Sequence, residues 1–147
     1  MFRSIVVGTD GSDTATQAVR EAIDLASAIG ATLQLVSAFA PVSEQRLKAE
    51  RRDAPEEVQW AINPKQEVEA SLGGAAEMAR QAGVTVNTFA RQGDPADAIL
   101  DVAEEQGADL VIVGNKGMTG AKRFLLGSVP NKVSHHAPCS VLIVRTT

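Results

Sequence analysis

Cysteine and aromatic residues are scarce in this 147-residue sequence, and no long hydrophobic run occurs. The single cysteine, Cys139, cannot form an internal disulfide, which fits a reducing compartment such as the cytosol. Aromatic residues make up 3% of the chain, and no two share a predicted strand, so it lacks the base-stacking platform of many RNA-binding domains. No apolar run approaches the roughly 20 residues that span a bilayer.

Positive charge is also in deficit. The sequence has 14 Lys and Arg against 18 Asp and Glu, a net charge of −4, whereas non-specific nucleic-acid binding needs a clustered basic face. We therefore expect neither nucleic acid nor a membrane as a partner. Length and composition predict one soluble domain over residues 1–147 that folds without disulfides or metal. The N-terminus shows no secretion signal, so we expect a cytoplasmic protein.

Short apolar runs alternate with longer segments of helical periodicity. The predicted strands are Ile5–Thr9, Thr32–Phe39, Val84–Ala90, Leu110–Val113 and Val141–Val144. The first run lacks polar alternation, as in strands buried on both faces, and the last two are the most apolar, so we expect helices to cover most of their length. The alternation predicts an α/β fold: a doubly wound open sheet of five mainly parallel strands in the order 3-2-1-4-5, with helices on both faces.

Three helices have recognisable ends. The first carries an apolar stripe over 15–29 and ends at Gly30; it begins either with a Thr14–Gln17 capping box or at Ser12. Another begins with Asp94 and Pro95 and stops at Gly107. A third runs from Pro64 to Gly83, with these residues predicted inward: Val68, Leu72, Ala75, Ala79 and Ala82. For its internal Gly73-Gly74 pair we predict close helix–sheet packing.

The segment before that helix has a different composition. Residues 44–57 contain nine charged side chains in fourteen positions, which predicts an exposed, mobile connection. Trp60, the only tryptophan, is expected to pack this connection onto the body of the protein.

Ligands of doubly wound sheets bind beyond the carboxyl ends of the strands, where the strand order reverses, here between the first and fourth strands. The first strand is followed by Asp10-Gly11-Ser12, and the fourth by a glycine-rich segment that ends in Gly127-Ser128. Glycines let main-chain N–H groups approach an anion, and the next helix start adds unpaired N–H groups. Positive charge on this segment comes from Lys116, Lys122 and Arg123. These features predict a polyphosphate cradle, although neither the Walker motif nor G-x-G-x-x-G is present.

The spacing Gly114-x2-Gly117-x9-Gly127-Ser128 is similar to the nucleotide-binding motif G-x2-G-x9-G-[ST] of the universal stress protein family. Residues 5–12 resemble that family's first strand and its Asp-containing turn, and residues 137–144 resemble its last strand. The resemblance covers essentially the whole chain and is weakest over residues 44–62. It implies ATP binding, a role in stress response as a nucleotide-dependent regulator without rapid turnover, and a homodimer paired through the last strand, the predicted sheet edge.

The resemblance also implies roles for individual residues. Adenine and ribose would lie against Gly8, Thr9 and Asp10, with the main chain of Ala38 meeting the adenine; Asp10 is equally a common turn residue. The ribose and α-phosphate side would be lined by Val113, Gly114, Lys116 and Gly117. The β- and γ-phosphates would be held by Gly127, Ser128 and Val129.

Alternatives to an ATP-binding regulator remain open. Pro130, which lacks an N–H group, stands where family members often carry a hydroxyl residue, and this leaves room for AMP or cyclic AMP and hence a nucleotide sink. A slow ATPase or adenylating enzyme is the other alternative, with the 44–62 connection closing as a lid.

We identify no catalytic residue and no metal ligand in the sequence. No nucleophile or acid–base pair can be placed in the pocket, so we expect no enzyme beyond slow ATP hydrolysis. Neighbouring side chains on a helix point about 100° apart, so His135 and His136 are predicted to lie at a helix surface without metal. Cys139 is predicted to be a structural thiol. Any Mg²⁺ is expected to bind through the nucleotide phosphates.

Overall fold

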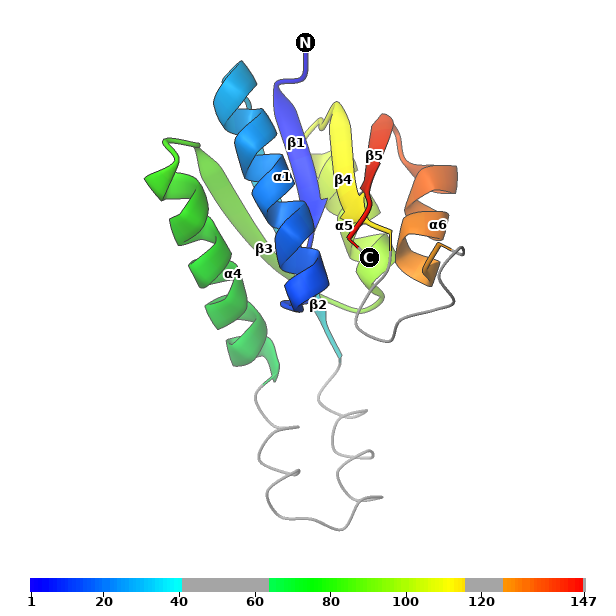
Figure 1. Cartoon of the computed structure of the whole chain (residues 1–147). Helices are drawn as coiled ribbons and strands as arrows, with labels where there is room; N and C mark the ends of the chain where they lie inside the picture. The colour runs from blue at the N-terminus through cyan, green and yellow to red at the C-terminus, as the bar shows by residue number, and fades with distance from the viewer. Residues whose placement is uncertain (41–63, 116–125, 147) are drawn as a thin grey trace, which may run out of the picture.

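A computed structural model describes residues 1–40, 64–115 and 126–146 (Figure 1). Its single sheet has five strands in the order β3-β2-β1-β4-β5, and every neighbouring pair is parallel. The strands are β1 (Ser4–Gly8), β2 (Thr32–Phe39), β3 (Val86–Gln92), β4 (Leu110–Gly114) and β5 (Ser140–Val144). The predicted doubly wound α/β fold and its strand order are confirmed.

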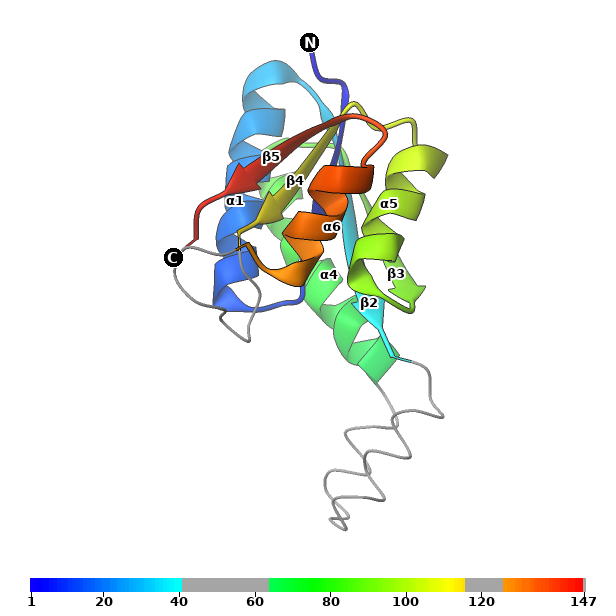
Figure 2. The ribbon, with the colours of Figure 1, turned by 90° about the vertical axis from the view of Figure 1, so that its right-hand side faces the viewer.

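Helices cover both faces of this sheet. One face carries α1 (Asp13–Ile29) and α4 (Pro64–Gln81), and the other carries α5 (Pro95–Glu105) and α6 (Ser128–His136), as the two perpendicular views show (Figure 2). Among the described helices, none combines the length and apolarity that a bilayer span requires.

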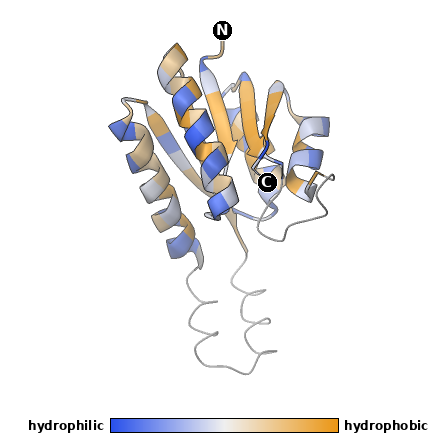
Figure 3. Ribbon diagram, in the orientation of Figure 1, coloured by the Kyte–Doolittle hydropathy of each residue, from blue (hydrophilic) through white to orange (hydrophobic). Residues whose placement is uncertain are grey.

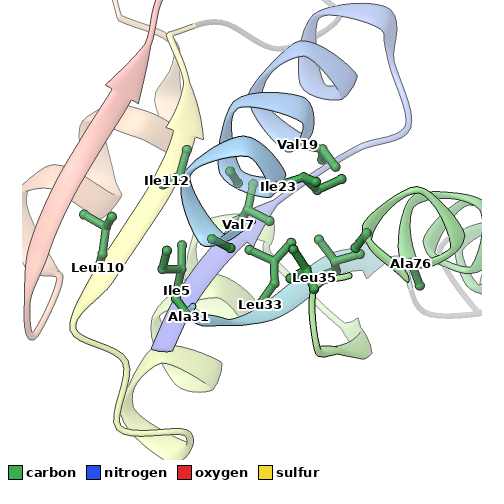
Figure 4. Close-up of a cluster of buried hydrophobic side chains, with 14 of the residues drawn as sticks. Ile5, Val7, Val19, Ile23, Ala31, Leu33, Leu35, Ala76, Leu110 and Ile112 are labelled. Atoms are coloured by element: carbon green, nitrogen blue, oxygen red, sulfur yellow. The ribbon is translucent and has the colours of Figure 1, made fainter. Parts of the chain in front are cut away.

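The strands at the centre of the sheet are buried on both faces. Their successive side chains point to opposite sides of the sheet, and helices cover each side. Towards α1 and α4 point Ile5, Val7, Leu33, Leu35 and Ile112, which form one core cluster with residues of those helices (Figure 4). Val6, Val36, Val111 and Val113 form a second cluster with α5 and α6. Figure 3 shows the hydrophobic colour concentrated along β1, β4 and β5, whereas β3 is partly hydrophilic.

Three helices end in the same way. A glycine with left-handed φ lies one or two residues after the end of each helix, and the apolar residue that follows this glycine is buried and donates its N–H to a carbonyl five residues back. The glycines are Gly30, Gly83 and Gly107, with φ of 72°, 76° and 58°. The N–H donors are Ala31, Val84 and Ala108, at 3.0, 3.0 and 2.9 Å from their acceptors. These turns direct the chain back into the sheet.

The starts of α1 and α5 test the predicted N-cap residues. Ser12 is the N-cap of α1 and accepts a hydrogen bond from the N–H of Ala15, so the Thr14–Gln17 capping box is wrong and the alternative is right. Asp94 caps α5 by accepting from the N–H of Asp97, as predicted.

Other corrections concern α4 and β3. A Cβ at Gly73 or Gly74 would meet nothing within 4 Å, so the predicted close packing is wrong. Ala82 is exposed, and Ala76 is buried instead. β3 begins two residues later than predicted, because Val84 belongs to the turn that closes α4.

β5 is less covered than its apolar sequence predicts. Among the described strands it has β4 as its one neighbour, and its residues are partly buried except for the exposed Ser140 and Leu142. Val141 and Ile143 pack with the α5–α6 cluster, whereas Leu142, on the opposite face, is 43% exposed.

Candidate functional site

The predicted site residues that the structure describes lie around the carboxyl ends of β1, β2 and β4, at the point where the strand order reverses. β1 pairs with both other strands, and the N–H of Thr9 donates to the carbonyl of Val36 at 2.9 Å. The structure therefore brings the turn after β1, the end of β2 near Ala38, and Gly114 into one neighbourhood. Predicted residues outside the described ranges are Lys116, Gly117, Lys122 and Arg123, as are Trp60 and the 44–62 connection.

The turn after β1 is organised by its own side chains. Oδ1 of Asp10 accepts from the N–H of Ser12 at 2.9 Å, and Oγ1 of Thr9 accepts from the N–H of Gly11 at 3.1 Å. Asp10 therefore has the hydrogen-bonding role in a turn that its residue type predicts. Because the Asp10 side chain is also exposed, its predicted contact with a nucleotide stays a prediction.

Gly8 has a packing role that the sequence did not reveal. A Cβ at this position would overlap Cδ1 of Ile99 and lie 2.9 Å from its Cγ1. Glycine at position 8 thus lets α5 approach the end of β1. The predicted contact of Gly8 with adenine or ribose is not needed to explain this residue.

Val113 and Ala38 contribute to the core beside the site. Val113 is 3% exposed and Ala38 is partly buried, both in the cluster under α5 and α6. A ligand beyond the strand ends would therefore reach Val113 through its main chain.

The start of α6 offers main-chain hydrogen-bond donors. Gly127 is the N-cap, and no side chain caps the helix there. The N–H groups of Ser128 and Val129 lie in the first helical turn and have no intrahelical acceptor, Pro130 has no N–H group, and Asn131 donates to Gly127 at 3.1 Å. Two adjacent donors at the positive end of the helix dipole can bind an anion.

Asn115 joins the elements of the site, although the sequence motifs do not include it. Its carbonyl accepts the N–H of Gly127 at 2.9 Å, so the start of α6 lies directly beside the end of β4. Its Oδ1 accepts from both the N–H and Oγ1 of Thr146. The available signal was its position, because asparagine directly after a strand commonly bonds to nearby main chain.

Lys132, in the middle of α6, is paired with two carboxylates. Lys132 contacts Oδ1 of Asp97 at 2.8 Å and Oδ2 of Asp94 at 3.5 Å, which ties α6 to the start of α5. The hydrogen bond to Asp97 is the main reason that the pKa of Lys132 is raised, so this amine stays charged at neutral pH.

Nothing in the surroundings of the two histidines or of Cys139 points to a metal site or a reactive thiol within the described residues. His135 and His136 are exposed at the end of α6, and the described residues contain no group of three His, Cys, Asp or Glu that could hold a metal. Burial raises the pKa of the Cys139 thiol, and the charge of Asp109 raises it further. This environment favours the inert thiol predicted for Cys139.

Comparisons with known proteins show the family and the fold of this chain. The family model of the Universal stress protein family matches residues 1–145. Universal stress protein Rv1636 of Mycobacterium tuberculosis is 38% identical over 147 residues, which cover 99% of this chain and 98% of the relative.

Two solved structures share the fold. A universal stress protein crystallised in complex with cAMP has a TM-score of 0.75 and 33% identity, over 99% of this chain and 98% of that one. The hypothetical protein MJ0577 has a TM-score of 0.82 and 25% identity, over 100% and 98% of the two chains. The match of the family model over nearly the whole chain, together with these relatives, shows that the chain belongs to the universal stress protein family.

Proposed function

We propose that this protein binds an adenine nucleotide beyond the carboxyl ends of β1 and β4 and acts as a nucleotide-dependent regulator in a cytoplasmic stress response. The observation that carries the proposal is the hydrogen bond between the N–H of Gly127 and the carbonyl of Asn115. It sets the two donor groups of α6 beside the strand-order reversal, where doubly wound sheets bind their ligands. The related protein crystallised with cAMP supports an adenine nucleotide as the ligand.

The conformation of Gly127 supports the same proposal. Its φ of −64° and ψ of 168° are open to every residue, so main-chain geometry does not demand glycine there. Close approach of a ligand to the start of α6 is the explanation that we propose for it.

The direct experiment measures binding of ATP, AMP and cyclic AMP by calorimetry, together with the small molecule released when the purified protein is denatured. Replacement Gly127→Leu is expected to abolish binding while the protein stays folded. The matched control is Gly73→Leu on the exposed face of α4, where space is open, and it should bind like the wild type. Retained affinity in Gly127→Leu would refute the proposed position of the phosphates.

Cyclic AMP or AMP is a second candidate ligand with specific support. Pro130 removes the third N–H group of the first α6 turn, which reduces the donors available for a long phosphate tail. Tighter binding of cyclic AMP than of ATP would favour a nucleotide sink. With ATP, we propose that Mg²⁺ is held by the phosphate oxygens, which it commonly bridges in nucleotide sites.

We propose a regulator rather than an enzyme with rapid turnover. The paired or exposed charged groups described above include no nucleophile with an adjacent base, which fast phosphoryl transfer would need in position. Turnover of ATP at about 1–100 s⁻¹, as in kinases, would contradict this proposal.

We also propose that the protein is a homodimer paired through β5. The open edge of this strand and the exposed Leu142 beside it are features that a second copy would cover.

A further inference from the structure

Within the described residues, at least four hydrogen bonds converge on Asn115, the residue that follows β4. Its main-chain N–H donates to the carbonyl of Val144 at 2.9 Å, and its carbonyl accepts from the N–H of Gly127 at 2.9 Å. Its side-chain Oδ1 accepts from the N–H of Thr146 at 2.8 Å and from Oγ1 of Thr146 at 3.0 Å. One residue thus connects the end of β4, the start of α6 and the segment after β5.

The two main-chain bonds fix the relative position of the corners that we assign to the nucleotide. Gly114 immediately precedes Asn115 and pairs with Val144 across the sheet, while Gly127 bonds to its carbonyl. A rotation of the peptide unit at residue 115 would therefore change the distance between both corners. A displacement of about 1 Å is enough to weaken a site built from several main-chain donors.

The side chain holds that peptide unit in place. An amide oxygen has two lone pairs, and Thr146 supplies a donor to each of them, so Oδ1 is fully used. An aspartate would accept the same two hydrogen bonds but would add a negative charge next to the site proposed for phosphate. A neutral amide is the acceptor that suits an anionic ligand here.

We propose that Asn115 is a positioning residue, which sets the separation of the Gly114 and Gly127 corners and makes nucleotide affinity depend on Thr146 after β5. This inference rests on the proposed function. By thermodynamic linkage the dependence is reciprocal, so a bound nucleotide stabilises the hydrogen bonds of Thr146 to the same extent. The end of the edge strand then responds to the occupancy of the site.

The test compares adenosine, AMP and ATP by calorimetry on full-length variants. Asn115→Ala is expected to weaken AMP and ATP about fivefold to tenfold, roughly the effect of one or two lost hydrogen bonds, with less than about a twofold change for adenosine. Thr146→Val should weaken them in the same direction but less, because its N–H remains. The double variant should lose less than the sum of the two single losses.

Asn115→Asp separates geometry from charge. It keeps both hydrogen bonds from Thr146, so adenosine affinity should stay at the wild-type value. The loss should grow from AMP to ATP because each added phosphate charge is repelled by the new carboxylate.

Asn87→Ala is the matched control. Asn87 donates from its side chain to Oε1 of Gln34 at 3.1 Å, near the amino end of β2, so its removal should lower stability and leave all three affinities unchanged. Hydrogen exchange supplies a readout that a purely structural role would not change. Saturating AMP should slow exchange of the Thr146 amide in the wild type and not in Asn115→Ala.

The outcomes separate this inference from the proposed function. If the wild type binds none of these three ligands and does not bind cyclic AMP either, the proposed function itself is wrong. If the wild type binds them and folded Asn115→Ala binds them equally well, or loses adenosine as strongly as ATP, the positioning role is wrong. Thr146→Val leaves Asn115 in place, so it decides the question even if Asn115→Ala does not fold.

Discussion

At the scale of single residues, Asp109 joins the amino ends of β1 and β4, far along the strands from the candidate site. Its carboxylate accepts from the N–H groups of Arg3 and Ser4 at distances of 2.9–3.1 Å. Partial burial would raise the pKa of Asp109, but these N–H groups and its own N–H lower it more, so the net pKa lies below the ordinary range. The charged form is therefore bound more tightly in the folded state.

Asp109→Asn should lower the free energy of unfolding by about 1 kcal/mol at pH 7, since a charge-assisted acceptor is lost at a partly exposed position. A lowered folded-state pKa stabilises the protein above the carboxyl's unfolded pKa, and this contribution is lost as pH falls through the folded-state value. Urea unfolding of both proteins should therefore show curves that converge below about pH 4. A difference that does not change with pH would contradict this assignment.

Cys139 offers a second prediction at this scale, because it is the only thiol in the chain. Burial, followed by the charge of Asp109, raises its pKa, so little thiolate is present at neutral pH. Alkylation at pH 8 should be slower in the folded protein than in urea, because partial burial and the raised pKa both protect the thiol. Asp109→Asn should speed the folded-state reaction, and equal rates in both proteins would exclude an electrostatic contribution from Asp109.

At the scale of secondary-structure elements, α4 carries a defect that can be repaired. Gly73 and Gly74 lie in its interior at exposed positions, where an added Cβ would meet nothing within 4 Å. Each replacement by alanine should raise the free energy of unfolding by about 1 kcal/mol, because glycine loses more main-chain entropy in a helix. Thermal or urea unfolding of Gly73→Ala, Gly74→Ala and the double variant measures this gain.

Gly8→Ala is the opposite case and the control for that experiment. Its added methyl group would overlap Ile99, so α5 must move or Ile99 must change rotamer, and stability should fall by about 1–3 kcal/mol. If Gly8→Ala and Gly73→Ala changed the free energy of unfolding equally, the space around each glycine would not determine the effect of an added methyl group.

The elements also show how far sequence reasoning reaches. The strands from Ser4 and Thr32 and the caps at Asp94 and Gly30 follow from local rules, since apolar runs and capping side chains act within a few residues. The prediction of a strand at Val84 is wrong because a buried valine after a glycine has the same sequence signature in a strand and in a helix-closing turn. Only the fold distinguishes these two environments.

The candidate site divides in the same way. The glycine spacing predicted a phosphate site between the end of β4 and the start of α6, which stays a prediction, and the fold brings Gly114 and Gly127 to neighbouring positions through Asn115. Two features depend on contacts distant in sequence, so their partners could not be predicted: the packing of Gly8 against Ile99 and the bonds of Asn115 to Thr146. No local pattern encodes a partner about thirty residues or more away.

At the scale of the whole molecule, the sheet has two edges of different character. β3 is polar on much of its surface and carries the paired charge of Arg91, which donates two hydrogen bonds of 2.8 Å to Glu105 of α5. Charged side chains on an edge strand discourage pairing with another chain. β5 carries the apolar run Val141–Val144 instead and leaves Leu142 43% exposed. The contrast favours association through the β5 edge.

Leu142→Lys should therefore shift a wild-type homodimer towards monomer, because a desolvated charge at a self-complementary interface is placed opposite its own copy. Sedimentation velocity at micromolar concentration measures the change. The matched control, Phe89→Lys, places the same charge on one of the partly buried residues of β3, the opposite edge strand, and should leave the sedimentation coefficient unaltered. A monomeric wild type would contradict pairing through β5. A dimer that persists in Leu142→Lys and dissociates in Phe89→Lys would instead place the interface at the opposite edge of the sheet.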